Sequence, residues 1–145
     1  MKKVNPDAID KSVLMKTESL YDFAEVTMEK RPNFLSRILV LTDEGIGNCQ
    51  SHYSKQLLKS QLREQVQSGM LPQAIVLLNR GVLLGTSSSL VLDELRALES
   101  QGVLILSNIS CLEFHKALDQ IVVGGVSTMG NIMELMNLAK SVVYI

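Results

Sequence analysis

The sequence predicts an α/β protein of three layers, in which helices cover both faces of a parallel sheet of about five strands. Short apolar runs rich in β-branched residues alternate with longer segments whose apolar residues recur at helical spacing. The short runs have no polar face, which is typical of strands buried on both sides. Because the chain has 145 residues, we expect one main domain.

Each predicted element is bounded by residues that favour turns or helix ends. Glycine, asparagine and proline separate most of the apolar runs, and serine and threonine precede several amphipathic segments. The predicted strands are 38–42, 73–79, 103–106, 121–123 and 142–145. The predicted helices are 51–67, a helix capped by the hydroxyls of 86–89 and ending at Ser100, 111–118 and 128–139.

Residues 1–36 are expected to form an N-terminal arm, and residues 37–145 the main domain. Apolar side chains between residues 19 and 28 have the spacing of one short amphipathic helix, and Arg31-Pro32-Asn33 ends that pattern. An amphipathic helix needs a surface for its apolar face. We therefore expect the arm to pack on the domain or on a neighbouring subunit.

Charge and hydropathy argue against two classes of partner. Fourteen basic residues stand against fifteen acidic ones, giving a net charge of -1, so nucleic acid and anionic membranes are not expected as partners. The lysines at the start precede no apolar core of signal-peptide length, and no apolar run is long enough to span a bilayer. A cytoplasmic location is predicted, where Cys49 and Cys111 are reduced thiols rather than a disulfide.

Neither a metal nor a cofactor is expected. The two cysteines lie in no Cys-x-x-Cys pair and near no zinc-type cluster of ligands. The glycine-bearing turn at 43–48 follows a predicted strand, and its backbone amides could approach an anion. It lacks the third glycine of a dinucleotide fingerprint and the Gly-Lys-Ser/Thr of a triphosphate loop, so an ordinary tight turn is the alternative.

The segment Gly102–Leu118 is the main functional candidate. A buried strand ends at Leu106, a turn of four short or polar residues follows, and Cys111 lies where the next helical pattern begins. Ligands of α/β proteins bind at the carboxyl ends of the strands, and a helix N-terminus favours a thiolate. Cys111 is therefore the predicted nucleophile. The alternative is a structural cysteine that fills the core as a small apolar side chain.

Two further residues are candidates with open alternatives. His115 lies one helical turn after Cys111, where its imidazole could assist thiolate formation, or it is a surface histidine without a role. Arg80, in the loop after the second strand, pairs with an anionic group of a substrate or partner, or it is simply solvated. Cys49 lies just beyond the turn at 43–48 and is expected near the same sheet edge as Cys111.

Four spaced motifs, in order, resemble a known family. They are Asn79-Arg80-Gly81-Val82, Gly102-Val103-Leu104-Ile105-Leu106-Ser107, Cys111-Leu112 and Val123-Gly124-Gly125-Val126-Ser127-Thr128-Met129. From about Arg37 onward the chain resembles the C-terminal domain of the YedF proteins, sulfurtransferase-like proteins of selenium metabolism in the DsrE-like superfamily. The resemblance implies a DsrE-like fold, a cysteine that carries sulfur as a persulfide, and a homo-oligomer, either a dimer or a trimer. Cys111 matches that cysteine, and Asn79 and Gly81 match the loop beside it.

Two features differ from the family pattern. YedF proteins usually have a second cysteine three residues earlier, where this chain has Asn108, and they carry a TusA-like domain for which residues 1–36 are too short. The expectation is therefore a carrier with one thiol that needs a separate sulfur donor, of TusA-like or cysteine-desulfurase type, and a separate acceptor protein.

The leading hypothesis is a sulfur- or selenium-handling protein in which Cys111 is the nucleophile. Ser107, Asn108 and Ser110 are expected to line the site and to donate hydrogen bonds to the sulfur. One alternative is a DsrE-like binding or assembly module without catalysis, because a fold does not imply a function. A weaker alternative is a binder of a small molecule or nucleotide that uses the turn at 43–48.

Overall fold

The computed structural model describes residues 34–47 and 51–145, so the helix expected between residues 19 and 28 and the thiol of Cys49 lie outside the described residues. Within these ranges five strands form one parallel sheet of order β4-β3-β2-β1-β5. The strands are β1 (Phe34–Leu41), β2 (Leu71–Leu77), β3 (Leu104–Asn108), β4 (Gly125–Ser127) and β5 (Ser141–Tyr144). The helices are α2 (His52–Ser68), η2 (Asn79–Gly85), α3 (Leu92–Ser100), α4 (Ile109–Phe114), η3 (Leu118–Gln120) and α5 (Met129–Leu138).

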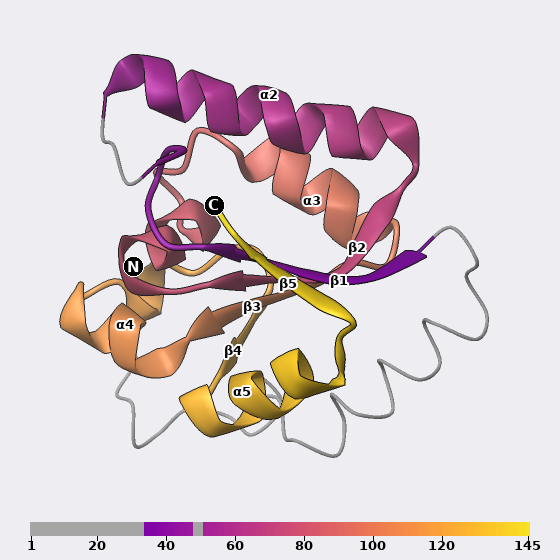
Figure 1. The fold of residues 1–145 in the computed structure, drawn as a ribbon. Helices are drawn as coiled ribbons and strands as arrows, with labels where there is room; N and C mark the ends of the chain where they lie inside the picture. The colour runs from indigo at the N-terminus through magenta and orange to yellow at the C-terminus, as the bar shows by residue number, and fades with distance from the viewer. Residues whose placement is uncertain (1–33, 48–50) are drawn as a thin grey trace.

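Helices cover both faces of the sheet, which confirms the predicted three-layer α/β/α architecture. Helices α2 and α3 lie on one face and α5 lies on the other, while α4 and η2 lie towards the carboxyl ends of the strands (Figure 1). Alternate strand residues enter two separate cores, as the pleat requires. Ile75 faces the core that contains Leu58 of α2, and Val76 faces the core that contains Ile132 of α5.

Helix α2 has the boundaries expected from its sequence. The hydroxyl of Ser51 accepts a hydrogen bond from the amide of Ser54 at 3.1 Å, and Gly69 ends the helix in the left-handed conformation with φ 72°. Leu58 and Leu62 are its buried apolar residues. No helix in the described part of the chain is long and apolar enough to cross a membrane.

The strand predicted at 121–123 is wrong. Ile121 makes only an isolated antiparallel bridge with Thr86, and the amides of Val122 and Val123 both donate to the carbonyl of Gly85. The strand begins at Gly125 because Gly124, with φ 79°, first turns the backbone close to β3. A Cβ at position 124 would lie 2.6 Å from the carbonyl oxygen of Ile105, so only glycine fits there.

Other boundaries also differ from the prediction. The predicted turn of residues 107–110 is wrong, because β3 continues to Asn108 and α4 begins at Ile109. Strand β1 begins at Phe34, inside the segment expected to be the arm, and β2 occupies residues 71–77 rather than 73–79. The loop after β2 is the 3₁₀ helix η2, and α3 begins only at Leu92. The hydroxyl of Ser89 accepts a hydrogen bond from the amide of Val91 at 3.1 Å, so this serine stabilises the turn before α3 instead of capping the helix.

Gly81 fixes the loop after β2 to the end of β1. The amide of Leu78 donates to the carbonyl of Leu41 at 3.0 Å, and a Cβ at position 81 would collide with that same carbonyl group. The loop after β2 therefore contacts the end of β1 through its backbone, and there is no room for a side chain at position 81. This is the physical reason for the glycine in the Asn-Arg-Gly-Val motif.

We predict that Gly81→Ala destabilises the protein by about 3 kcal/mol or more, because the backbone of β1 cannot move aside as a flexible side chain would. Gly130→Ala is the matched control. Gly130 lies in α5 with open space around it, so alanine should stabilise the helix by about 0.5–1 kcal/mol. Chemical denaturation measures both free energies of unfolding. Equal stabilities for the two variants would contradict the close contact at Gly81.

Candidate functional site

Cys111 lies in the first turn of α4, directly after β3. The helix begins at Ile109, two residues earlier than predicted, because Asn108 caps it: its Oδ1 accepts a hydrogen bond from the amide of Cys111 at 2.9 Å. The predicted end at Leu118 is also wrong. The helix stops at Phe114, and Lys116 follows in the left-handed conformation with φ 53°. The thiol is half-buried and packs against the core beneath α2 and α3.

A backbone amide from the neighbouring loop reaches the sulfur. The amide of Asn79 donates a hydrogen bond to Cys111 Sγ at an N···S distance of 3.2 Å. Asn79 is the first residue of η2, and its φ of 51° is unusual for a residue other than glycine. An N–H donor stabilises sulfur that carries negative charge, so this contact supports nucleophilic chemistry at Cys111. The structure thus brings Asn79 and Cys111 together across 32 positions of sequence.

Ser107 and Asn108 place two buried polar groups immediately before Cys111. The hydroxyl of Ser107 and the Nδ2 of Asn108 have no hydrogen-bond partner in the part of the chain described, although both residues are almost completely buried. Such groups normally find partners, so their unused hydrogen-bonding capacity is notable. Ser110 is exposed. The role of all three as donors to the sulfur stays a prediction, because Asn79 is the donor that the structure provides.

The imidazole of His115 is directed at an aromatic neighbour. Its ring meets that of Phe114 edge to face, with centroids 5.0 Å apart. His115 is the C-cap of α4, and its backbone amide, not its ring, bonds to the carbonyl of Cys111. Its Nε2 is buried and has no hydrogen-bond partner among the residues described. A proton-transfer role for this ring remains a prediction.

Arg80 forms ion pairs within the protein, rather than being solvated. Its Nη2 lies 2.7 Å from Glu44 Oε2, and its Nε lies 3.5 Å from Asp43 Oδ1. The carboxylates follow β1 and the guanidinium follows β2, and Leu41 pairs with Leu77 at the ends of these strands. The sequence contained a signal for this pairing: opposite charges two and three residues beyond paired positions of adjacent parallel strands.

Comparison with known proteins identifies the fold. No protein-family model matches the chain, and no curated protein matches its sequence. Among solved structures, the YchN protein from E. coli is similar with a TM-score of 0.54 and 18% identity, over 75% of this chain and 98% of YchN. The chain has a DsrE-like fold.

A cavity lies beside Glu44, in the turn that follows β1. This cavity has a volume of about 240 Å³ and is lined by Glu44, Lys55, Leu84, Ser88, Leu90 and Val91. It is smaller than the roughly 300–1,000 Å³ of pockets that hold drug-sized ligands, and Glu44 in its wall is negatively charged. The small volume argues against a nucleotide site in the cavity, whereas its charges do not decide the question, because Lys55 lies in the same wall as Glu44.

We predict that Asn108→Ala lowers the free energy of unfolding by about 1 kcal/mol and also changes the alkylation rate of Cys111, because it frees the first turn of α4. Thr128→Ala is the matched control. Thr128 caps α5 in the same way, its Oγ1 accepting from the amide of Asn131 at 3.2 Å, so its loss should cost similar stability. Denaturation and alkylation rates are measured on both variants. An unchanged alkylation rate of Cys111 in Asn108→Ala would show that the cap does not influence the thiol.

Proposed function

We propose that this DsrE-like protein carries sulfur as a persulfide on Cys111. The observation that supports this most directly is the hydrogen bond from the Asn79 amide to Cys111 Sγ. It provides a fixed donor, at the carboxyl edge of a parallel sheet, for a sulfur atom that gains negative charge during exchange. Cys111 is half-buried rather than fully buried, which is compatible with attack on a sulfur donor.

Transfer of one sulfur atom from a donor persulfide to Cys111 involves no net oxidation or reduction. The Cys111 thiolate attacks the outer sulfur of a donor persulfide, and a new sulfur–sulfur bond forms on Cys111. The sulfur–sulfur bond of the donor breaks, and its electron pair leaves on the donor thiolate. An acceptor thiolate then attacks the outer sulfur on Cys111 in the same manner, which regenerates the Cys111 thiolate. No metal, cofactor or added oxidant is needed for this sequence.

The more specific part of the proposal follows the resemblance to YedF proteins. In this more specific proposal, the protein handles sulfur or selenium in the cytoplasm, where reducing conditions keep Cys111 as a thiol. Its donor is a TusA-like or cysteine-desulfurase-type protein, its acceptor is another protein, and it works as a homo-oligomer. The motifs at Asn79–Val82 and at Cys111-Leu112 support this, since the structure brings these two segments into contact.

We predict that Cys111 takes up one sulfur atom from glutathione persulfide, seen by intact and peptide mass spectrometry as the added mass on the Cys111 peptide. Cys111→Ser should lose the adduct, whereas Cys49→Ser should retain it. The rate of alkylation of the native protein is measured in parallel. A Cys111 that reacts only after unfolding is a structural thiol, and that result would favour the alternative of a DsrE-like binding or assembly module without transfer chemistry.

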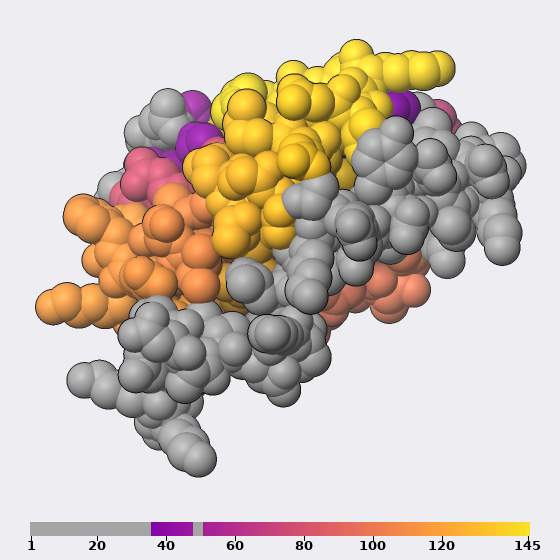
Figure 2. Space-filling view, turned by 90° about the horizontal axis from the view of Figure 1, so that it is seen from below, coloured from indigo at the N-terminus to yellow at the C-terminus, as the bar shows by residue number. Residues whose placement is uncertain are grey.

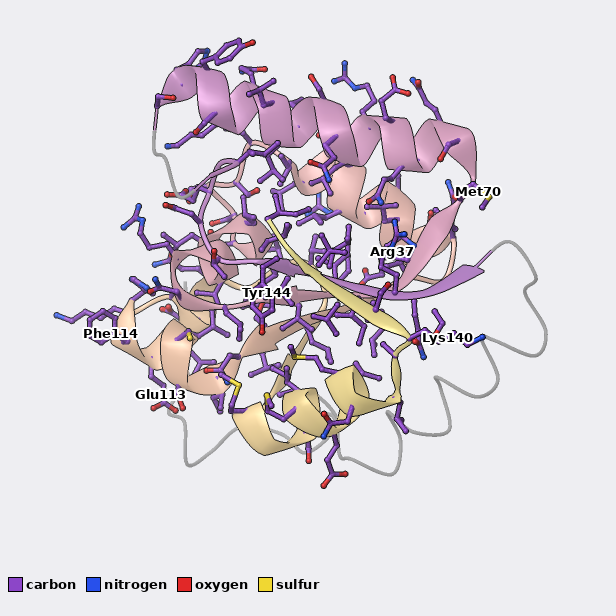
Figure 3. The ribbon with its side chains drawn as sticks, viewed as in Figure 1. Arg37, Met70, Glu113, Phe114, Lys140 and Tyr144 are labelled. Atoms are coloured by element: carbon purple, nitrogen blue, oxygen red, sulfur yellow. The ribbon has the colours of Figure 1, made fainter. Side chains whose placement is uncertain are left out.

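The end of α4 offers a contact for a protein donor. Phe114 lies three residues after Cys111 with 79% of its side chain exposed, and both Phe114 and Glu113 project away from the body of the protein (Figure 3). The surface of α4 continues into that of α5 and the C-terminal residues, seen in orange, gold and yellow in Figure 2. Exposed aromatic side chains are common anchors in protein interfaces.

We predict that Phe114→Ala slows sulfur uptake from a persulfidated cysteine desulfurase about tenfold, but leaves uptake from glutathione persulfide unchanged. Tyr53→Ala is the control, since Tyr53 has 72% exposure on α2 and belongs to a different element from the thiol. Its uptake from both donors should match the wild type. Equal effects of Phe114→Ala on both donors would mean that Phe114 acts on the thiol itself and not on docking.

A further inference from the structure

The loop that carries Asn79 is fixed on both sides of this residue. On one side, the amide of Leu78 is bonded to the carbonyl of Leu41. On the other side, the guanidinium of Arg80 is held by the two carboxylates of the turn after β1. The amide of Gly81 closes the loop by donating to the carbonyl of Leu78 at 2.8 Å. Asn79 is thus the residue between two anchored neighbours.

Asn79 needs such anchors because its own conformation is unfavourable. A φ of 51° is unfavourable for a residue other than glycine, although asparagine tolerates it better than most. The side chain of Asn79 is exposed, so core packing does not hold it. In this loop conformation the amide of Asn79 is directed at Cys111 Sγ, with an N···S distance of 3.2 Å.

We propose that Arg80, through Asp43 and Glu44, is a positioning residue that holds the Asn79 amide on the sulfur of Cys111. This inference rests on the proposed function, in that it explains how the site keeps the amide of Asn79 directed at the sulfur. The Arg80 cluster, defined as Asp43, Glu44 and Arg80, thereby joins the loops after β1 and β2 to the nucleophile after β3.

The surroundings of the cluster make the effect measurable. Asp43 is buried, and its Oδ1 also accepts a hydrogen bond from the amide of Glu44 at 2.8 Å, so the acidic turn is itself rigid. The pair between Arg80 and Glu44 is partly exposed and contributes little to overall stability, whereas loss of Arg80 also leaves the buried Asp43 without its ion pair. The test therefore uses readouts at the site itself, which a change in overall stability would not move.

The test compares alkylation of Cys111 by iodoacetamide at about pH 7 and at about pH 10, where nearly every cysteine is ionised. The rate at the higher pH reports access to the sulfur. The ratio of the rate at about pH 7 to the rate at about pH 10 therefore reports how strongly the site stabilises the thiolate. We expect Arg80→Ala to lower this ratio about threefold to tenfold, as for the loss of one hydrogen bond. The charges of Glu113, His115 and Lys116 on and beside α4 are the same in all variants and do not affect the comparison.

A second measurement reports the amide directly. The ¹H–¹⁵N resonance of Asn79 should shift in Arg80→Ala and move part of the way back in Arg80→Lys, which retains one charge contact but not the guanidinium fork. Asp43→Asn and Glu44→Gln remove the carboxylate charges that pair with Arg80. They replace Arg80→Ala in the test if that variant fails to fold.

Lys59→Ala is the matched control. It removes an ion pair with Glu94 whose side chains are exposed to 30% and 8%, close to the 35% and 9% of Arg80 and Asp43. Neither the rate ratio nor the Asn79 resonance should change in this variant. An unchanged ratio in Arg80→Ala, or an equal loss in Lys59→Ala, would overturn the inference. If the wild-type thiol takes up no sulfur, the proposed function fails, whereas normal uptake with an unaffected Asn79 amide rejects only the role of Arg80.

Discussion

The carbonyl group of Leu41 is the point on which the arrangement of the site depends. It ends β1, accepts the amide of Leu78 and lies against the bare Cα of Gly81, so it holds the start and the middle of the loop after β2. Because β1, β2 and β3 are adjacent and parallel, their carboxyl ends meet at one edge of the sheet. The loop fixed by Leu41 is consequently the one that meets Cys111 from β3.

The position of Cys111 could be predicted because it follows from local sequence. An apolar run before a helical pattern indicates a strand followed by a helix, and in a parallel sheet the junction between them lies on the ligand-binding edge. The turn predicted at that junction is wrong, because β3 passes directly into α4. The amide donor could not be predicted in the same way. It depends on the backbone angle of Asn79 and on a contact between segments 32 residues apart, and neither has a signature in composition or periodicity.

Errors in the predicted boundaries have a common physical cause. The apolar run Ile121–Val123 has the side chains of a strand, but its backbone amides bond to Gly85, and the ladder with β3 begins only after Gly124. Helix α4 begins at Ile109 rather than at the predicted Cys111, because the side chain of Asn108 caps it by accepting a hydrogen bond from the amide of Cys111. In each case a tertiary or capping hydrogen bond determines where the element begins, whereas the apolar pattern of the sequence indicates only which side chains are buried.

Asn108 also decides how a persulfide on Cys111 can react. A thiol at this position could attack the inner sulfur of the persulfide, close a disulfide with Cys111 and release the outer sulfur as sulfide. An asparagine amide has no such reactivity, and its oxygen is already bonded to the amide of Cys111. The segment of residues 107–111 contains no other thiol, so under the proposed function it could not release sulfur from Cys111 by itself. The proposed function then requires an acceptor thiol from outside this segment, and the exposed end of α4 beside Cys111 is where we propose that such a partner binds.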